Sequence, residues 1–359
     1  MAKEKVIIGM SGGVDSSVAA ALLLEQGYDV IGVTMKIWPD SLGEDKIREG
    51  GCCSLSAVDD ARRVAHRLGI PYYVMNFQEI FEKKVIDYFI EEYQRGRTPN
   101  PCIACNKYVK FDALLKKAVA MDVQYVATGH YARVIYDDNL GRFLIKKSAT
   151  ASKDQTYALY NLTQEQLKHI LMPLGDYTKE ETREIARKLG LGVASKPDSQ
   201  EICFVEDNDY AGFIEKRTGR KAEKGFFVDV DGNILGEHKG IIHYTVGQRK
   251  GLGIAFGKPM YVVAVDAQKN QVVLGEEGQQ YRSTLIASNI NFIPFDRLER
   301  EMEVTAKIRY SAKEAEAVIS PEGEDRVLVR FKTPQRAVTP GQAVVFYDGD
   351  VLVGGGTIE

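Results

Sequence analysis

The segment "KVIIGMSGGVDSS" at residues 5–17 joins an apolar run to a glycine-rich turn. The run at 5–10 is short and largely apolar, which is typical of a strand buried on both faces of a parallel sheet. Gly12 and Gly13 follow it, and apolar residues at helical spacing come next. Because a buried strand, a turn and a helix in this order begin a βα unit, the segment predicts an α/β fold.

The same alternation of strand and helix patterns continues through the first part of the chain. Further strand-like runs are "DVIGVTM" at 29–35, "PYYVMNF" at 71–77 and "VQYVATGH" at 123–130. Apolar residues at helical spacing separate these runs. We therefore predict a doubly wound parallel sheet in a first domain at 1–207, with ligands beyond the carboxyl ends of its strands.

The pattern changes after residue 207. Short β-rich segments broken by Gly, Pro and Asn take over, for example "FFVDVDGNILGEH" at 226–238 and "QAVVFYDGDVLVGGG" at 342–356. Such spacing of strands and turns is typical of hairpins and small barrels. We predict a small mixed domain at 208–279 and a C-terminal β-barrel at 280–359.

The composition is that of a soluble globular protein, with 44% apolar and 27% charged residues. No apolar run approaches the ~20 residues that a membrane helix needs. The first residues lack the apolar core and cleavage site of a signal peptide. We expect a cytoplasmic protein with no membrane partner. The net charge of −3 means that a nucleic acid would have to bind through local basic patches.

The turn "GMSGGVDSS" at 9–17 has the features of an anion cradle. Its glycines let the backbone approach an anion, and the following helix offers N–H groups and the positive end of its dipole. The Lys-Ser/Thr pair of a Walker A loop is absent. Asp15 places a carboxylate where phosphate would lie, which makes sense if Mg²⁺ bridges them. The alternative is an ordinary glycine-rich turn capped by serine.

This turn resembles the SGGxDS signature of the PP-loop pyrophosphatases. Those enzymes split ATP between its α and β phosphates and use AMP to activate an oxygen of the substrate. The resemblance implies an adenine nucleotide hydrolase-like fold for the first domain, with ATP and its Mg²⁺ as cofactors.

The cysteines offer several kinds of chemistry. Cys102 and Cys105 form a CxxC pair in a predicted loop, ahead of a helix expected at about 107–120. Such a pair can be half of a zinc site, a redox couple or two buried thiols. Cys52 and Cys53 could complete a zinc site, but adjacent cysteines chelate poorly. We therefore expect no structural zinc.

Cys203 lies in a polar stretch, which does not suit a core residue. Together with Cys105 it makes chemical sense. An adenylated carbonyl oxygen is a leaving group that a sulfur nucleophile can replace, and thiolates are such nucleophiles. One cysteine would hold a persulfide, and the other would close a disulfide to release the product.

Several longer motifs extend the resemblance to one family, the tRNA-specific 2-thiouridylases. They are "GRTPNPCIACNKYVKF" (96–111), "ATGHYAR" (127–133), "SKDQTY" (152–157), "KPDSQEICFV" (196–205), "KIRY" (307–310) and "TPGQ" (339–342). The resemblance implies replacement of O2 by sulfur on the wobble uridine of tRNA, with ATP consumed to AMP and pyrophosphate. It also implies that the C-terminal barrel contacts the tRNA.

The family's functional residues match individual positions of this chain. Cys105 matches the nucleophile, and Cys203 matches the persulfide carrier, which forms a transient disulfide with Cys105. The ATP-binding positions are matched by Gly9, Met10, Ser11, Gly12, Gly13, Val14, Asp15, Ser16, Met35 and Gly129. The positions that meet the target base or the tRNA are matched by Asn100, Pro101, Cys102, His130, Lys153, Asp154, Gln155, Arg309, Tyr310 and Gln342. Cys102 is a departure, because many members have an acidic residue there.

Other classes of protein share part of this pattern. Argininosuccinate synthetase and GMP synthetase have similar loops, but their reactions need no cysteine pair. A non-catalytic RNA-binding protein that senses nucleotides is a third possibility, and His130 could be an ordinary strand-end histidine. For the thiouridylase reaction, the sulfur donor would be a cysteine desulfurase, acting alone or through a sulfur-relay carrier.

Overall fold

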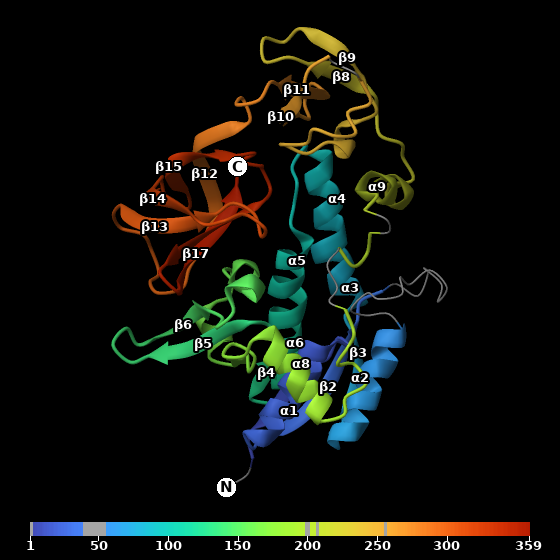
Figure 1. The fold of residues 1–359 in the computed structure, drawn as a ribbon, viewed down its shortest axis with the longest axis vertical. Helices are drawn as coiled ribbons and strands as arrows, with labels where there is room; N and C mark the ends of the chain where they lie inside the picture. The colour runs from blue at the N-terminus through green and yellow to red at the C-terminus, as the bar shows by residue number, and fades with distance from the viewer. Residues whose placement is uncertain (1–2, 39–54, 198–201, 206–207, 255–256) are drawn as a thin grey trace. The chain divides into compact units, whose positions relative to one another are not determined.

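A computed structural model describes residues 3–38, 55–197, 202–205, 208–254 and 257–359 (Figure 1). The chain divides into two compact units. The first consists of Met1–Val85, Cys102–Phe204 and Asp350–Leu352, and the second of Ile86–Pro101, Val205–Gly349 and Val353–Glu359. No helix within the described residues is long and apolar enough to cross a membrane.

The first unit contains a five-stranded parallel sheet. Its strands are β1 (Lys5–Gly9), β2 (Asp29–Lys36), β3 (Tyr72–Asn76), β4 (Tyr125–Ala127) and β7 (Ile170–Leu171), in the order β3-β2-β1-β4-β7. Val6, Ile7 and Ile8 of β1 are fully buried, as expected for the central strand of a sheet with two covered faces. The predicted doubly wound parallel sheet is confirmed.

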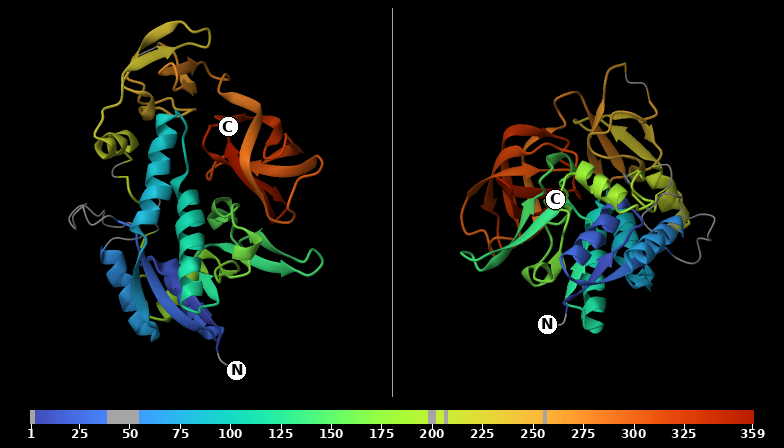
Figure 2. Two further views of the ribbon diagram at one scale, coloured as in Figure 1. Left: turned by 180° about the vertical axis from the view of Figure 1, so that it is seen from behind. Right: turned by 60° about the horizontal axis from the view of Figure 1, so that its bottom comes forward.

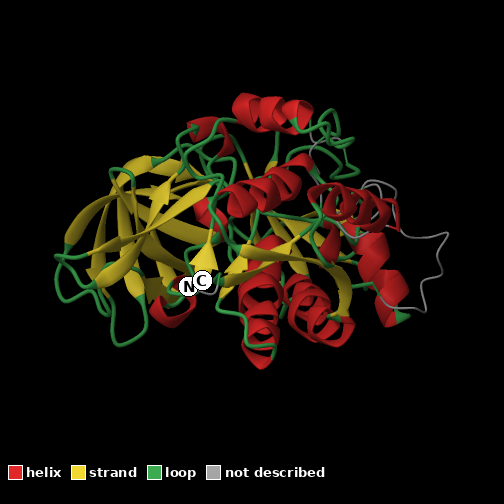
Figure 3. Ribbon diagram, turned by 90° about the horizontal axis from the view of Figure 1, so that it is seen from below, coloured by secondary structure: helices red, strands yellow, loops and turns green. Residues whose placement is uncertain are grey.

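Helices cover both faces of this sheet (Figure 3). On one face, α1 (Val14–Glu25), α2 (Leu55–Leu68) and α8 (Lys179–Lys188) share a core with β1. On the other face, Leu114 of α6 (Leu114–Ala120) lies close to Gly9. The start of α8 is set by a capping box, in which Thr178 and Glu181 satisfy each other's backbone N–H groups.

A run of helical segments begins at Pro101, earlier than predicted. It consists of α5 (Pro101–Ala104), the π-helix η4 (Cys105–Ala113) and α6, and it is visible in Figures 1 and 2. The expected loop around Cys102 and Cys105 is therefore wrong. Proline is favoured at the first position of a helix, because the N–H that it lacks has no helical partner there.

The remaining elements of the first unit include a hairpin that the sequence patterns did not predict. Strands β5 (Ala132–Asp137) and β6 (Arg142–Lys147) are antiparallel, and Val351 pairs with Lys146 of β6. The short segments are α3 (Gln78–Phe81), the π-helix η3 (Glu82–Ile86), the 3₁₀-helices η5 (Ala151–Lys153) and η6 (Thr156–Ala158), and α7 (Gln164–Leu167).

The second unit begins with α4 (Asp87–Gln94) and α9 (Tyr210–Thr218) and continues with a four-stranded sheet. Its strands are β8 (Gly225–Val228), β9 (Ile234–His238), β10 (Tyr261–Asp266) and β11 (Gln271–Gly275), in the order β10-β11-β8-β9, with the 3₁₀-helix η7 (Ile241–His243) between β9 and β10. The β11–β8 pair is parallel and the others are antiparallel, so the sheet is mixed. Together with α9 it makes up the small mixed domain that the sequence predicted.

Six strands at the end of the chain form the predicted barrel. They are β12 (Tyr281–Phe292), β13 (Met302–Lys307), β14 (Ala315–Pro321), β15 (Val327–Arg336), β16 (Ala343–Asp348) and β17 (Val351–Ile358). Their order is β12-β15-β14-β13-β16-β17, and the pairing of β12 with β17 closes the sheet. Inward-facing residues such as Ile319, Val329 and Phe346 are fully buried.

Candidate active site

The glycine-rich turn lies between β1 and α1, as the sequence predicted. Gly12 has a φ of +67°, and a Cβ there would lie 2.2 Å from the carbonyl oxygen of Ala57. Only glycine satisfies both conditions without strain. Ser17 donates to the carbonyl of Gly13 at 2.8 Å, and Ser16 accepts from the N–H of Ser11 at 3.2 Å. The hydroxyls thus hold the turn in shape.

Met35 and Gly129 lie at the same edge of the sheet, near the carboxyl ends of β2 and β4. A Cβ on Gly9 would lie 3.6 Å from Cε of Met35. A Cβ on Gly129 would lie 2.6 Å from the backbone nitrogen of Ser16, so the turn after β4 packs directly on the start of α1. This is the edge at which open α/β sheets bind ligands.

Asp15 is held by two residues that the sequence analysis did not identify. Both of its carboxylate oxygens accept from Nζ of Lys179, at 2.6 and 2.8 Å, and Oδ1 also accepts from the hydroxyl of Tyr131 at 2.8 Å. The Lys179 side chain is 7% exposed and that of Asp15 is 31% exposed. The carboxylate of Asp15 is thus held at the start of α1 by a buried ammonium group and a tyrosine hydroxyl.

The three described cysteines all lie in the first unit. Cys102 is exposed on α5, Cys105 is half buried at the first residue of η4, and Cys203 is half buried. The neighbour of Cys203, Phe204, is buried edge-on against Phe81, with ring centroids 5.8 Å apart. The structure therefore anchors the chain directly after Cys203.

The described residues offer no group of side chains that could hold a structural zinc ion. No three His, Cys, Asp or Glu side chains gather into a metal site within the described ranges. Cys52 and Cys53, which the zinc alternative requires, lie outside those ranges. The expected absence of structural zinc stays a prediction.

His130 follows β4 and is half buried. Its Nδ1 lies 2.7 Å from the hydroxyl oxygen of Thr128, and its ring packs against Phe111 at 5.7 Å between centroids. Burial, together with the charge of Lys110, holds the pKa of His130 well below its ordinary value. The imidazole is therefore neutral at pH 7.

The segment at 153–155 has contacts within the protein. Asp154 accepts from the N–H of Ser148 at 3.0 Å, and Gln155 accepts from the N–H of Tyr131 at 2.9 Å. Through these hydrogen bonds, Asp154 and Gln155 stabilise the backbone of the segment at 153–155. Lys153, the last residue of η5, is half buried.

In the second unit, Arg309 and Gln342 have structural partners. The guanidinium of Arg309 donates to the carbonyls of Val246 at 3.0 Å and Ala337 at 2.9 Å. Gln342 donates to the carbonyl of Thr98 at 2.7 Å, which places it beside the segment that leads to Asn100 and Pro101. Tyr310 is 49% exposed.

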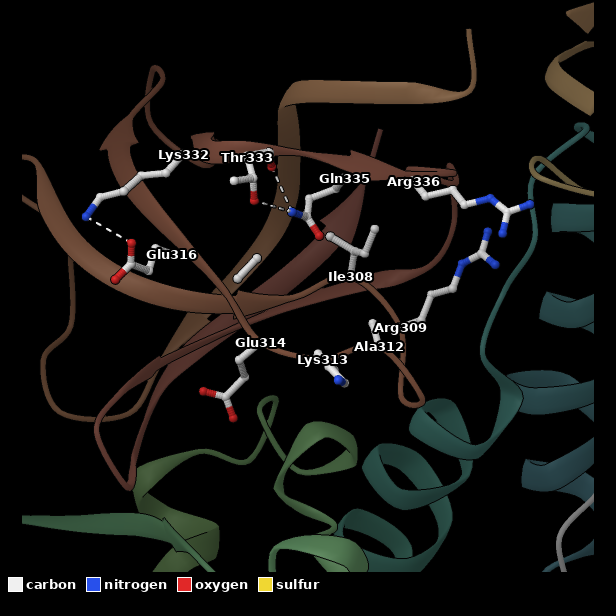
Figure 4. A pocket seen from close by; sticks show the side chains of 11 residues that line it. Ile308, Arg309, Ala312, Lys313, Glu314, Glu316, Lys332, Thr333, Gln335 and Arg336 are labelled. Atoms are coloured by element: carbon white, nitrogen blue, oxygen red, sulfur yellow. Dashed lines mark hydrogen bonds and ion pairs between the residues drawn. The ribbon is translucent and has the colours of Figure 1, made fainter. Parts of the chain in front are cut away.

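A cavity of about 480 Å³ lies beside Arg309 (Figure 4). Its charged lining residues are Arg309, Lys313, Glu314, Glu316, Lys332 and Arg336. Lys332 pairs with Glu316 at 3.1 Å, and both side chains are largely exposed, so this pair contributes little to stability. The other charged side chains of the lining are the cations Arg309, Lys313 and Arg336 and the carboxylate Glu314, so positive charge is in excess there.

Three family models match the chain in succession. They are a tRNA methyl transferase HUP domain at residues 4–207, a tRNA methyl transferase PRC-barrel domain at 211–276 and an aminomethyltransferase beta-barrel domain at 282–358. The matches follow the order of the parallel sheet, the mixed sheet and the barrel.

Curated relatives match over the full length. The tRNA-specific 2-thiouridylase MnmA of Acetivibrio thermocellus is 68% identical over 359 residues, which is 100% of both chains. The enzyme named MnmA 1 of Thermoanaerobacter sp. is 65% identical and covers 99% of this chain and 98% of its own. That of Clostridioides difficile is 61% identical, with the same coverage.

Proposed function

This chain belongs to the tRNA-specific 2-thiouridylases, which use ATP to thiolate tRNA, and on that premise we propose which of its residues perform the reaction. The observation that carries the proposal is the identity of 60–68% with such enzymes over essentially the whole chain. The glycine-rich turn at 9–16, Met35 and Gly129 bind ATP.

The first step activates the uridine. O2 of the wobble uridine attacks the α phosphate of ATP, and pyrophosphate leaves. The N–H groups at the start of α1 stabilise the charge on the phosphates. Mg²⁺ enters with the ATP phosphates, and Asp15, which pairs with Lys179, meets the ion through those phosphates. Structural zinc has no place in this proposal.

The second step transfers sulfur. The outer sulfur of a persulfide on Cys203 attacks C2 of the uridine, a C–S bond forms and AMP leaves. The thiolate of Cys105 then attacks the inner sulfur, forming a Cys105–Cys203 disulfide and releasing 2-thiouridine. A thiol reductant regenerates both cysteines. The outer sulfur comes from a cysteine desulfurase or a relay carrier, and the reaction takes place in the cytoplasm.

Residues of both units contact the tRNA in this proposal. Asn100, Pro101 and Cys102 lie beside the target base, and the segment 153–155 and His130 meet the tRNA from the first unit. The barrel contributes Arg309, Tyr310 and Gln342. The domains are 1–207 for catalysis, 208–279 as a central domain and 280–359 for tRNA contact.

Nucleoside analysis of tRNA tests the assignment of the cysteines. After incubation with ATP, Mg²⁺, a thiol reductant, and a cysteine desulfurase with cysteine as the source of persulfide sulfur, the unaltered chain should form 2-thiouridine at the wobble position. Cys105→Ser and Cys203→Ser should each abolish it, because each removes one partner of the disulfide. Activity that survives in Cys105→Ser would overturn the mechanism.

Cys102 is tested in the same assay. It occupies a position where relatives often have a carboxylate, so we expect Cys102→Ser to slow thiolation and Cys102→Asp largely to restore it. Pyrophosphate release, measured in parallel, separates adenylation from sulfur transfer. Full activity in Cys102→Ser would remove the proton-acceptor role.

A further inference from the structure

A second lysine contacts the glycine-rich turn, at a position to which the family comparison assigns no role. Nζ of Lys196 donates to the carbonyl oxygen of Gly12 at 3.1 Å and to Oδ2 of Asp60 at 2.7 Å. The side chains of Lys196 and Asp60 are 27% and 23% exposed. The pair is thus partly shielded from water, and the lysine bridges α2 and the turn.

Lys196 and its partner Asp60 are both held in place by arginines. The guanidinium of Arg183, on α8, donates to the backbone carbonyls of Ala194 at 3.0 Å and Lys196 at 3.2 Å. Asp60 also pairs with Arg63 at 2.6 Å. Although burial opposes it, hydrogen bonds from Lys196 and Arg63 hold the pKa of Asp60 below its ordinary value. Asp60 therefore stays ionised and keeps Nζ of Lys196 on the turn.

The contact with Gly12 has a consequence for the next N–H group. The carbonyl of Gly12 and the N–H of Gly13 belong to one planar trans peptide, so they point in opposite directions. Since Nζ of Lys196 lies on the carbonyl side of this peptide, the N–H of Gly13 points away from the lysine. Within the described part of the chain, this N–H donates to no acceptor. It is available to a phosphate oxygen at the start of α1.

We propose that Lys196 is a positioning residue for ATP, which orients the Gly12–Gly13 peptide so that the N–H of Gly13 donates to a phosphate. The inference rests on the proposed role of the turn in ATP binding. Lys196 acts through the peptide and does not itself need to touch the nucleotide. In the sequence, Lys196 lies seven positions before Cys203.

Binding of ATP to the full chain, measured by calorimetry without tRNA, tests the proposal. Lys196→Met keeps the length of the side chain and removes its donors, and we expect it to weaken ATP binding at least tenfold. Lys196→Arg should recover most of the affinity. Lys188→Met is the control, since Lys188 is an exposed lysine of α8 that pairs only with Glu184 among the contacts described. It should bind ATP as the unaltered chain does.

The amide resonance of Gly13 separates a positioning role from a merely structural one. In protein labelled with ¹⁵N-glycine, ATP should shift this resonance in the unaltered chain and in Lys196→Arg, but not in Lys196→Met at saturating ATP. Asp60→Asn, which weakens the anchor of Lys196 with little change in shape, should give a loss of affinity of severalfold. If Lys196→Met does not fold, the affinity of Asp60→Asn for ATP tests the proposal in its place.

Three results would overturn the inference. One is ATP binding in Lys196→Met and Asp60→Asn within twofold of the unaltered chain. Another is weaker binding with an unchanged shift of Gly13, which would mean that Lys196 touches the phosphate itself. Failure of the unaltered chain to bind ATP would remove the ATP-dependent function as well, whereas the first two results would leave that function standing.

Discussion

At the scale of single residues, Asp15 has a structural contact in addition to its predicted role beside a phosphate-bound metal. The sequence predicts a carboxylate beside a phosphate-bound metal, whereas the structure pairs it with the buried Lys179 and with Tyr131. Removing one partner of such a pair costs more than the pair contributes, because the remaining charge is left without a counterion. We therefore expect Asp15 to contribute to stability in addition to its proposed place in the ATP-binding turn.

We expect Asp15→Asn and Lys179→Met each to lower the free energy of unfolding by about 1–3 kcal/mol, less than for a fully buried pair because Asp15 is partly exposed. The double variant should lose less than the sum of the two single losses. Urea titration at pH 7 measures all three. Lys83→Met, in the exposed pair with Glu79, is the control and should change stability by less than about 0.5 kcal/mol. Additive losses in the double variant would show that no pair exists in solution.

At the scale of elements, the site depends on how closely the turn after β4 packs on the start of α1. Gly129 lies at this junction, and its contacts are with the backbone of Asp15 and Ser16, which cannot move aside like a flexible side chain. Gly129 thus meets a packing requirement in addition to its proposed place beside ATP.

Replacement of Gly129 by alanine tests this packing. We expect Gly129→Ala to weaken ATP binding and to lower the free energy of unfolding by about 1–3 kcal/mol, as overpacking typically does. Gly192→Ala is the matched control, because a Cβ at Gly192 meets nothing within 4 Å and its backbone φ is ordinary for alanine. Calorimetry and urea titration of both variants give the comparison. Equal losses of stability in Gly129→Ala and Gly192→Ala would contradict close packing of the turn after β4 on the start of α1.

The helical run that begins at Pro101 sets the position of Cys105. It places Cys105 at the start of a π-helical segment, where the widened turn changes the direction of side chains relative to an α-helix. Such segments are frequent at functional sites. The position of the proposed nucleophile is therefore set by a helix and not by a loop.

At the scale of the whole molecule, a chain with a net charge of −3 has to bind a polyanion. The proposed tRNA contacts come from both units, through residues such as Lys153 and Tyr310. Binding should then depend on local phosphate contacts, each of which releases counterions from the tRNA.

We expect the affinity for tRNA to fall steeply with salt, and Lys153→Ala to reduce the slope of log K against log salt by about one. Filter binding of the full-length variants between low and physiological salt measures this slope. Lys188→Ala, on the exposed surface of α8, should leave it unchanged. An affinity that does not respond to salt would contradict binding through phosphates.

The sequence by itself determined the features that depend on local patterning. The alternation of apolar runs and helical spacing predicts the parallel sheet, and Gly12 and Gly13 predict the turn after β1, because these patterns involve residues adjacent in the chain. Cys102, Cys105 and Cys203 suggest sulfur chemistry through their residue type, although Cys203 lies far from the CxxC pair in the sequence. The family resemblance then supplied the individual site residues.

Only the tertiary structure decided which distant residues surround the turn. Lys179 and Lys196 are more than 160 residues from Asp15 and Gly12, and neither the local sequence of Lys179 nor the motif at 196–205 that Lys196 opens indicates a contact with the turn. They meet the turn because α8 packs on α1 and because Arg183 fixes the segment that ends at Lys196. Long-range ion pairs of this kind follow from how elements pack, which no short pattern encodes.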